Sequence, residues 1–241
     1  MLILAVYSPR GNCCNASIVT GRIPVQRSTK RRLQMKITLI GSGNMGSALA
    51  TQIAKAGHAL VITGRNADKA KELARTTGAV FKDHPAAEGA DVVVVATAYP
   101  DAVAALGSAG DLKGKVIVDI TNPLTADYTG LTIGHSTSAA EEIQKAFPGA
   151  KVVKAFNTVF AQVIAGGTKL AGATVPVYFA GDDAAAKETV KALIRSTGFA
   201  PVDAGGLRNA RYLEPLAALN IYFGYGAGRG TAIAPAWIGM Q

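Results

Sequence analysis

The feature that most constrains the fold is an apolar strand that leads directly into a glycine-rich turn and then into a helix. The strand is Lys36–Ile40. A G-x-G-x-x-G pattern follows, with its glycines at 41, 43 and 46. Apolar residues then recur at the spacing of one helix face through Ile53. This succession is typical of a dinucleotide-binding β–α–β unit.

Each glycine of the turn has its own physical role. Gly41 permits the tight turn, Gly43 lets the backbone approach a pyrophosphate, and Gly46 lets the helix pack closely on the strand. The free N–H groups at the helix start attract phosphate charge. The alternative is a tight turn without a ligand. We expect the cofactor pyrophosphate to contact the residues of this turn, which are Gly41, Ser42, Gly43, Asn44, Met45 and Gly46.

The end of the second expected strand distinguishes NADP from NAD. An NAD site needs Asp or Glu there for the ribose 2′-hydroxyl, whereas this chain has Thr63-Gly64-Arg65-Asn66. The Arg65 guanidinium can pair with a 2′-phosphate through charge-assisted hydrogen bonds, and Lys69 is close enough to reach the same phosphate. We therefore expect NADP(H). The alternative for both side chains is a solvated surface charge.

The rest of the chain alternates between strands and helices. Hydrophobic residues make up 49% of the chain and aromatic residues only 6%, which suits a parallel sheet covered by helices. The sequence predicts an α/β fold with a doubly wound, mostly parallel Rossmann sheet and a small C-terminal α/β lobe. The expected strands span 36–40, 59–63, 79–81, 91–96, 115–120, 151–156, 175–180 and 201–204.

Three segments are expected. Residues 35–157 form an NADP-binding domain, and residues 158–241 form a small lobe for substrate binding or dimerisation. A capping box of Ser138 and Glu141 is expected to start one helix, and the last helix is expected to begin near Glu214-Pro215. Residues 1–34 show no period. We interpret them as disordered or non-native sequence upstream of Met35, or as a targeting peptide.

Charge and cysteine content exclude several classes of protein. The net charge is +9, but six of the basic residues lie in residues 1–34, which contain no acid, so the remainder carries only +3. We find no basic, aromatic-interleaved surface for nucleic acid. The adjacent Cys13 and Cys14 match no metal spacing, and no apolar run is long enough to span a bilayer. We expect a cytoplasmic protein with no metal, nucleic-acid or membrane partner.

Further binding residues are expected at the carboxyl ends of the central strands, where ligands bind in open α/β sheets. Ala96 and Thr97 follow the four-valine strand, and Asn122 follows the next strand. His58, His84 and His135 are interpreted as structural or solvated. Arg208 and Arg211 could bind an acidic substrate, although Arg211 could instead pair with Glu214 one turn on.

The chain from Met35 to about Phe223 resembles the NADPH-dependent reductases of the deazaflavin coenzyme F420. The resemblance covers residues 36–46, 119–123, 136–158 and 181–216. Its most specific motifs are Ser138-Ala-Ala-Glu-Glu, Val153-Lys-Ala-Phe-Asn-Thr158, Gly198-Phe-Ala-Pro-Val-Asp-Ala-Gly205 and Ala210-Arg-Tyr-Leu-Glu-Pro215.

The resemblance implies hydride transfer between the nicotinamide C4 and the deazaflavin C5, with proximity supplying much of the rate. Archaeal members carry a histidine where this chain has Asn157, near the nicotinamide, and a hydroxyl residue where it has Gly64. Asn157 is then a positioning group, Thr63 can supply the hydroxyl, and no side chain is an essential acid or base. A homodimer is expected.

Other functions remain open at this point. One is reduction of another small substrate by an enzyme of the pyrroline-carboxylate reductase type, which has a similar Gly-Asn-Met start. Another is reduction of a ferric or flavin acceptor. A third is a non-catalytic module that senses NADPH.

Overall fold

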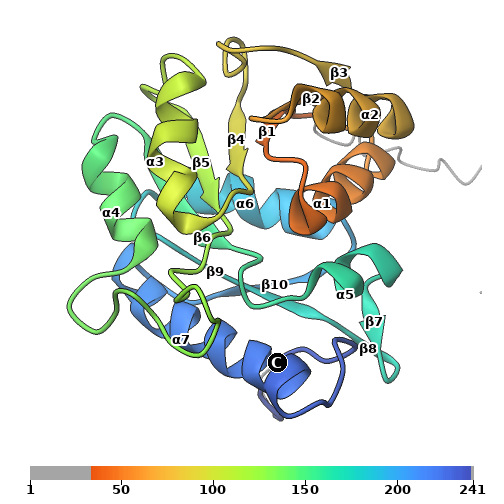
Figure 1. Ribbon diagram of the computed structural model, residues 1–241, viewed down its shortest axis with the longest axis vertical. Coiled ribbons are helices and arrows are strands. Elements are labelled where there is room, and N and C mark those ends of the chain that lie inside the picture. The colour runs from red at the N-terminus through yellow and green to blue at the C-terminus, as the bar shows by residue number, and fades with distance from the viewer. Residues whose placement is uncertain (1–33, 240–241) are drawn as a thin grey trace, which may run out of the picture. The chain divides into compact units, whose positions relative to one another are not determined.

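The computed structural model describes residues 34–239, and its centre is one eight-stranded sheet (Figure 1). The strand order is β10-β9-β6-β5-β4-β1-β2-β3. The neighbours from β3 to β6 are all parallel, while β9 is antiparallel to β6 and parallel to β10. The strands are β1 (Lys36–Ile40), β2 (Ala59–Thr63), β3 (Val80–Phe81), β4 (Val92–Val95), β5 (Val116–Asp119), β6 (Lys151–Ala155), β9 (Pro176–Gly181) and β10 (Ala200–Asp203). This order confirms the expected doubly wound, mostly parallel sheet.

Helices cover both faces of the sheet, and the strand pattern explains how. Ile37 and Leu39 of β1 pack with Leu49 of α1 in one apolar cluster, which also includes residues of α2 and α6. Ile40 points the other way and packs with Leu106 of α3 in a second cluster, which also includes residues of α4. This period of two is what a strand buried on both faces requires. The helices are α1 (Asn44–Lys55), α2 (Ala67–Thr77), α3 (Tyr99–Ser108), α4 (Ala139–Ala146), α5 (Ala161–Gly166), α6 (Ala184–Ser196) and α7 (Ala210–Ile221).

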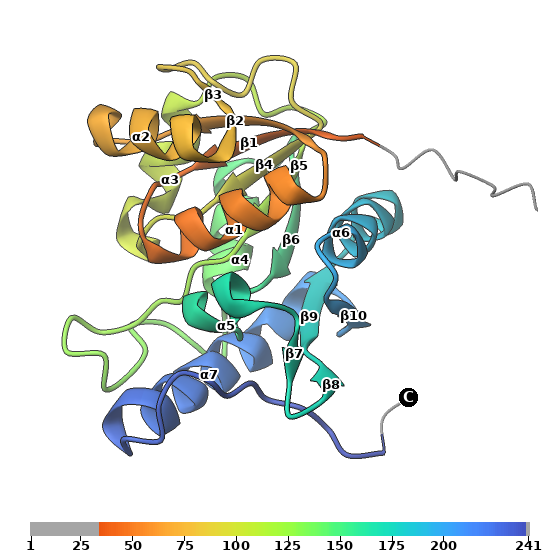
Figure 2. The same cartoon turned by 90° about the vertical axis from the view of Figure 1, so that its right-hand side faces the viewer.

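The helix α7 lies against the β9 end of the sheet. Leu213 of α7 packs with Tyr178 and Ala180 of β9, and Figure 2 shows α7 passing below α4 and α5 in that view. A small hairpin of β7 (Lys169–Leu170) and β8 (Ala173–Thr174) precedes β9. The part of the chain that carries residues 158–239 therefore extends the same sheet through β9 and β10.

The expected strand bounds differ from the observed ones by at most one residue at each end, but the expected start of the last helix is wrong. The last helix begins at Ala210, directly after a 3₁₀ turn at Leu207–Asn209, so that Pro215 lies inside the helix and not in its first turn. Leu213 and Glu214 are both buried, and their burial against β9 and β6 holds this earlier turn helical despite the proline. The sequence also gave no indication of α3 or α5.

The remaining expectations concern the N-terminal segment, membrane spans and metal sites. Residues 1–33, with Cys13 and Cys14, lie outside the described residues. Within residues 34–239, no helix is both long enough and apolar enough to cross a membrane, and no group of His, Cys, Asp and Glu could hold a metal ion.

Candidate functional site

The glycine turn joins β1 to α1, and its three glycines have different surroundings. A Cβ at Gly41, where φ is +116°, would overlap the carbonyl oxygen of Ala96, and a Cβ at Gly46 would overlap the carbonyl oxygen of Gly41. At Gly43 a Cβ would meet no atom within 4 Å. Gly41 and Gly46 are thus required by packing, whereas Gly43 faces open space.

The open space lies at the start of α1. Gly43 is the N-cap residue of this helix and provides no side-chain cap for the first backbone N–H groups. Gly43 and Asn44 are both exposed, which leaves that helix end accessible. Uncapped N–H groups beside a residue without a side chain fit a pyrophosphate, so the residues present suit the nucleotide that the pattern predicts.

The β2 end of the site carries the basic residues. The Thr63 side chain is buried, and its hydroxyl has no hydrogen-bond partner among the described residues. The Arg65 side chain is 90% exposed and lies 3.4 Å from the carboxylate of Asp101, in the first turn of α3. Lys69 is exposed in the first turn of α2, where its backbone N–H donates to the N-cap side chain of Asn66. Both cations therefore remain accessible to a phosphate.

The carboxyl end of β4 lies beside the glycine turn. The Ala96 backbone N–H donates to the carbonyl of Ile40 at 2.8 Å, and the Ala96 carbonyl is the atom that excludes a side chain at Gly41. Thr97 follows, and its hydroxyl donates to the carbonyl of Ala98. The structure thus brings these two predicted residues next to the turn.

Two asparagines meet at the ends of β5 and β6. Asn157 Nδ2 donates to Asn122 Oδ1 at 2.9 Å and to the Leu213 carbonyl at 3.0 Å, while Asn122 Nδ2 donates to the Asn157 carbonyl. Asn157 Oδ1 is buried with no partner among the described residues. The preceding Phe156 has φ of 62°, an uncommon conformation for a bulky residue, and it turns the chain out of β6 at this point.

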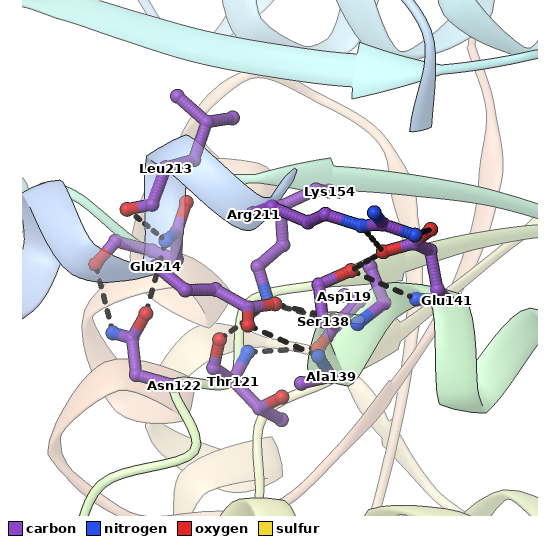
Figure 3. Close-up of polar contacts among 12 residues, drawn as sticks. Asp119, Thr121, Asn122, Ser138, Ala139, Glu141, Lys154, Arg211, Leu213 and Glu214 are labelled. Carbon is purple, nitrogen blue, oxygen red and sulfur yellow. Dashed lines mark hydrogen bonds and ion pairs between the residues drawn. The ribbon is translucent and has the colours of Figure 1, made fainter. Parts of the chain in front are cut away.

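Next to the asparagines lies a buried cluster of three charged side chains (Figure 3). Lys154 Nζ lies 2.7 Å from Asp119 Oδ2 and 2.8 Å from Glu214 Oε1, and it donates to the Thr121 carbonyl at 2.6 Å. Glu214 also accepts from the backbone N–H groups of Ala139 and Ala140 at the start of α4. None of the three charged side chains is more than 1% exposed.

The cluster has two carboxylates and one ammonium, and its pKa values reflect this. Burial lowers the pKa of Lys154, but the adjacent Asp119 and Glu214 outweigh burial and raise that pKa above its ordinary value. Burial raises the pKa of Glu214 above its ordinary value, against the opposing effect of Lys154 and the N–H donor from Ala139. The positive end of the α4 dipole offsets the excess negative charge.

A second ion pair joins the same two helices nearer the surface. Arg211 binds Glu141 through two hydrogen bonds, of 2.8 Å and 2.7 Å. The expected pairing of Arg211 with Glu214 is therefore wrong, because Glu214 points inward to Lys154. The Glu141 carboxylate also accepts from the Ser138 hydroxyl, which in turn accepts from the Glu141 backbone N–H. Ser138 and Glu141 thus cap α4 together.

The histidines lie apart from the asparagines. The His58 ring accepts from the Met35 backbone N–H and contacts the Ser196 hydroxyl, which makes it structural. His84 and His135 are exposed. The residues that sequence reasoning missed are Lys154 and Glu214. Their signal was a lysine within the apolar run of β6 and a glutamate on the buried face of α7.

Comparison with known proteins finds reductases that are similar to this chain. Residues 36–123 match the family described as NADP oxidoreductase, coenzyme F420-dependent. The F420-dependent NADP reductase of Methanothermobacter marburgensis is 30% identical over 210 residues, which cover 78% of this chain and 91% of that protein.

Two further similarities come from bacteria and from mammals. A crystal structure of a candidate F420-dependent NADP reductase from Arthrobacter sp. FB24 aligns with a TM-score of 0.75 and 32% identity, over 84% of this chain and all of that one. Metalloreductase STEAP3 of Rattus norvegicus is 31% identical over 181 residues, which are 75% of this chain. The match spans only 36% of the length of that metalloreductase. On the extent of the reductase matches, the chain belongs to the family of coenzyme F420-dependent NADP oxidoreductases.

Proposed function

We propose that this protein transfers a hydride between NADP(H) and the deazaflavin coenzyme F420. The proposal rests on family membership and on one structural observation. The glycine turn, the exposed Arg65 and the unpartnered Asn157 oxygen follow the carboxyl ends of β1, β2 and β6, which belong to one parallel part of the sheet. A dinucleotide binds across these carboxyl ends in doubly wound folds.

The predicted binding residues would contact three parts of the cofactor. The residues of the glycine turn would hold the pyrophosphate, with Ala96 and Thr97 beside it. Arg65 and Lys69 would bind the 2′-phosphate, next to Thr63 and Gly64. Asn122 and Asn157 would hold the nicotinamide end.

Bound NADPH supplies the hydride, and the protein supplies position. Asn157 Oδ1 can accept a hydrogen bond from a carboxamide N–H, because both protons of its own amide are already used. Neither exposed histidine has a hydrogen bond to Asn157 in the described residues, and we propose that no side chain acts as an essential acid or base. Positioning two rings in contact can account for much of the rate.

A ferric or flavin acceptor is the second candidate, favoured by the similarity to the rat metalloreductase. An acceptor screen separates the two. With NADPH as donor, we expect rapid turnover with F420 and slow turnover with free flavins and ferric chelates. Rapid turnover with a ferric chelate and none with F420 would favour the second candidate.

We also propose that the protein acts in the cytoplasm as a homodimer, with residues 35–157 as the NADP domain and 158–241 as the acceptor and dimer lobe. The support for a dimer is a set of large exposed side chains on and after α7, most of them aromatic, because aromatic residues are enriched in protein–protein interfaces. They are Tyr212, Leu219, Tyr222, Phe223 and Tyr225. Light scattering of the purified protein tests this state.

A further inference from the structure

None of the residues assigned above to the cofactor belongs to the buried cluster of Lys154, Asp119 and Glu214. It is also a poor way to gain stability, because two ions must be removed from water for each pair formed. Apolar side chains of similar volume would commonly serve stability as well or better. The cluster therefore calls for an explanation in terms of geometry.

Glu214 connects α7 to two other elements. Its Oε1 atom lies 2.8 Å from Lys154 of β6 and also accepts from the backbone N–H of Ala140, while its Oε2 atom accepts from the backbone N–H of Ala139 at 3.0 Å. Lys154 in turn holds the Thr121 carbonyl, one residue before Asn122. One glutamate thus fixes α7 against β6, the start of α4 and the segment that carries Asn122.

The residue before Glu214 contacts Asn157 directly. The Leu213 carbonyl accepts one proton of Asn157 Nδ2, and Asn122 Oδ1 accepts the other. The side-chain amide of Asn122 cannot flip by 180° without losing its own hydrogen bond to the Asn157 carbonyl. These contacts determine that Asn157 presents its oxygen, not its nitrogen, as the unpartnered group. That oxygen belongs to a residue only 6% exposed.

We propose that Lys154 and Glu214 are positioning residues: by fixing α7 they hold the Leu213 carbonyl in place, and so they set the orientation of the Asn157 carboxamide toward the nicotinamide. This inference rests on the proposed function in one respect, namely that the nicotinamide binds beside Asn157. It requires no particular hydride acceptor.

The test compares two ligands that share one end. Adenosine 2′,5′-bisphosphate carries the 2′-phosphate but no nicotinamide, whereas NADPH carries both. Calorimetry with Glu214→Gln should show weaker NADPH binding by about 2- to 13-fold, the equivalent of one hydrogen bond. Binding of adenosine 2′,5′-bisphosphate should stay within about twofold of the wild type. The turnover number with F420 should fall in parallel, because a misoriented Asn157 positions the nicotinamide less well.

Glu141→Gln is the matched control. It also removes a carboxylate that joins α4 to α7, through Arg211, but it has no contact with Lys154 or Leu213 in the described residues. We expect it to leave the ratio of the two affinities unchanged. The inference is overturned if Glu214→Gln weakens both ligands equally, if it weakens neither, or if Glu141→Gln changes the ratio as much.

A measurement on the wild type covers the case in which Glu214→Gln does not fold. Hydrogen exchange of the α7 backbone should slow when NADPH binds and should not slow when adenosine 2′,5′-bisphosphate binds. Equal exchange with the two ligands would overturn the inference. Failure of the wild type to reduce F420 would contradict the proposed function while leaving this comparison intact.

Discussion

The Arg65 guanidinium lies 3.4 Å from the Asp101 carboxylate, and this ion pair connects the segments that follow the two neighbours of β1 in the sheet. Arg65 follows β2 and Asp101 lies in the first turn of α3, after β4, and β1 lies between these two strands. The guanidinium is 90% exposed, so solvent screens the pair and it stabilises the fold little. The pair places a carboxylate next to the cation that we propose for the 2′-phosphate.

Replacing Arg65 by Ala should weaken NADPH binding far more than NADH binding. Loss of a charge-assisted hydrogen bond costs about 1.5–3 kcal/mol, which corresponds to about 10- to 150-fold in affinity. Titration of both cofactors against the variant measures this difference. Equal losses for the two would mean that Arg65 acts on folding and not on the 2′-phosphate.

Asp101→Asn should change affinity in the opposite direction. Without the competing carboxylate, NADPH binding should tighten by up to about fivefold, the upper range for an exposed ion pair, and NADH binding should change less. Asp111→Asn, a change at an exposed aspartate outside this ion pair, serves as the control. Weaker NADPH binding in Asp101→Asn would show that the carboxylate itself contacts the cofactor.

The glycines of the turn should separate into two classes. Gly43→Ala should leave the melting temperature nearly unchanged, because a Cβ there meets no atom within 4 Å, yet it should weaken NADPH because the methyl group occupies the space for the pyrophosphate. Gly46→Ala should lower the melting temperature, since its Cβ overlaps the Gly41 backbone. Thermal unfolding and cofactor titration of both variants check this. If Gly43→Ala binds NADPH with normal affinity, the pyrophosphate does not lie against Gly43 and the proposed placement is wrong.

Asn157→Ala should lower turnover by about 10- to 100-fold without abolishing it, as expected for the loss of a positioning contact. His84→Ala and His135→Ala should each cost no more than a few-fold, since both side chains are exposed. Steady-state turnover rates of the three variants and the wild type, measured at saturating NADPH, test these expectations. If either histidine variant is inactive while NADPH still binds, an acid–base residue exists and the positioning mechanism is wrong.

The Glu141–Arg211 pair should make stability depend on acid pH. Partial burial raises the pKa of Glu141, but hydrogen bonds from Arg211 and Ser138 outweigh it, so that the folded-state pKa lies below the ordinary value of 4.5. A lowered pKa adds stability above the ordinary value that is lost as the pH falls through the folded-state value. Glu141→Gln should therefore cost about 0.5–1 kcal/mol near neutral pH, and this cost should shrink as the pH falls through the folded-state pKa of Glu141. Urea unfolding over a series of acid pH values tests this, and a cost that stayed constant with pH would contradict it.

The sequence predicted the sheet well because its signals are local. The expected strand 59–63 has the observed bounds, and Asn66 and Gly78 cap α2 as their types suggest. The capping pair of Ser138 and Glu141 was also correct. Each of these features depends on residues a few positions apart.

The features that were missed depend on distant residues. Glu214 was expected to pair with Arg211 three positions away, but it pairs with Lys154, sixty positions earlier. The contact of Glu214 with Lys154 also keeps the first turn of α7 helical before Pro215. From the local sequence alone, Glu214-Pro215 resembles the start of a helix. A charged residue in an apolar strand indicates a buried partner, but nothing in the local sequence identifies that partner.

Deuterium transfer tests the central claim most directly. NADPH labelled with deuterium at the transferring position of C4 should be mixed with F420 and the protein, and the reduced deazaflavin examined by mass spectrometry. We expect one deuterium at C5 of the product, because hydride moves directly between two rings that the protein holds in contact. A product with no deuterium at C5, or NADPH that binds without reducing F420, would contradict direct hydride transfer.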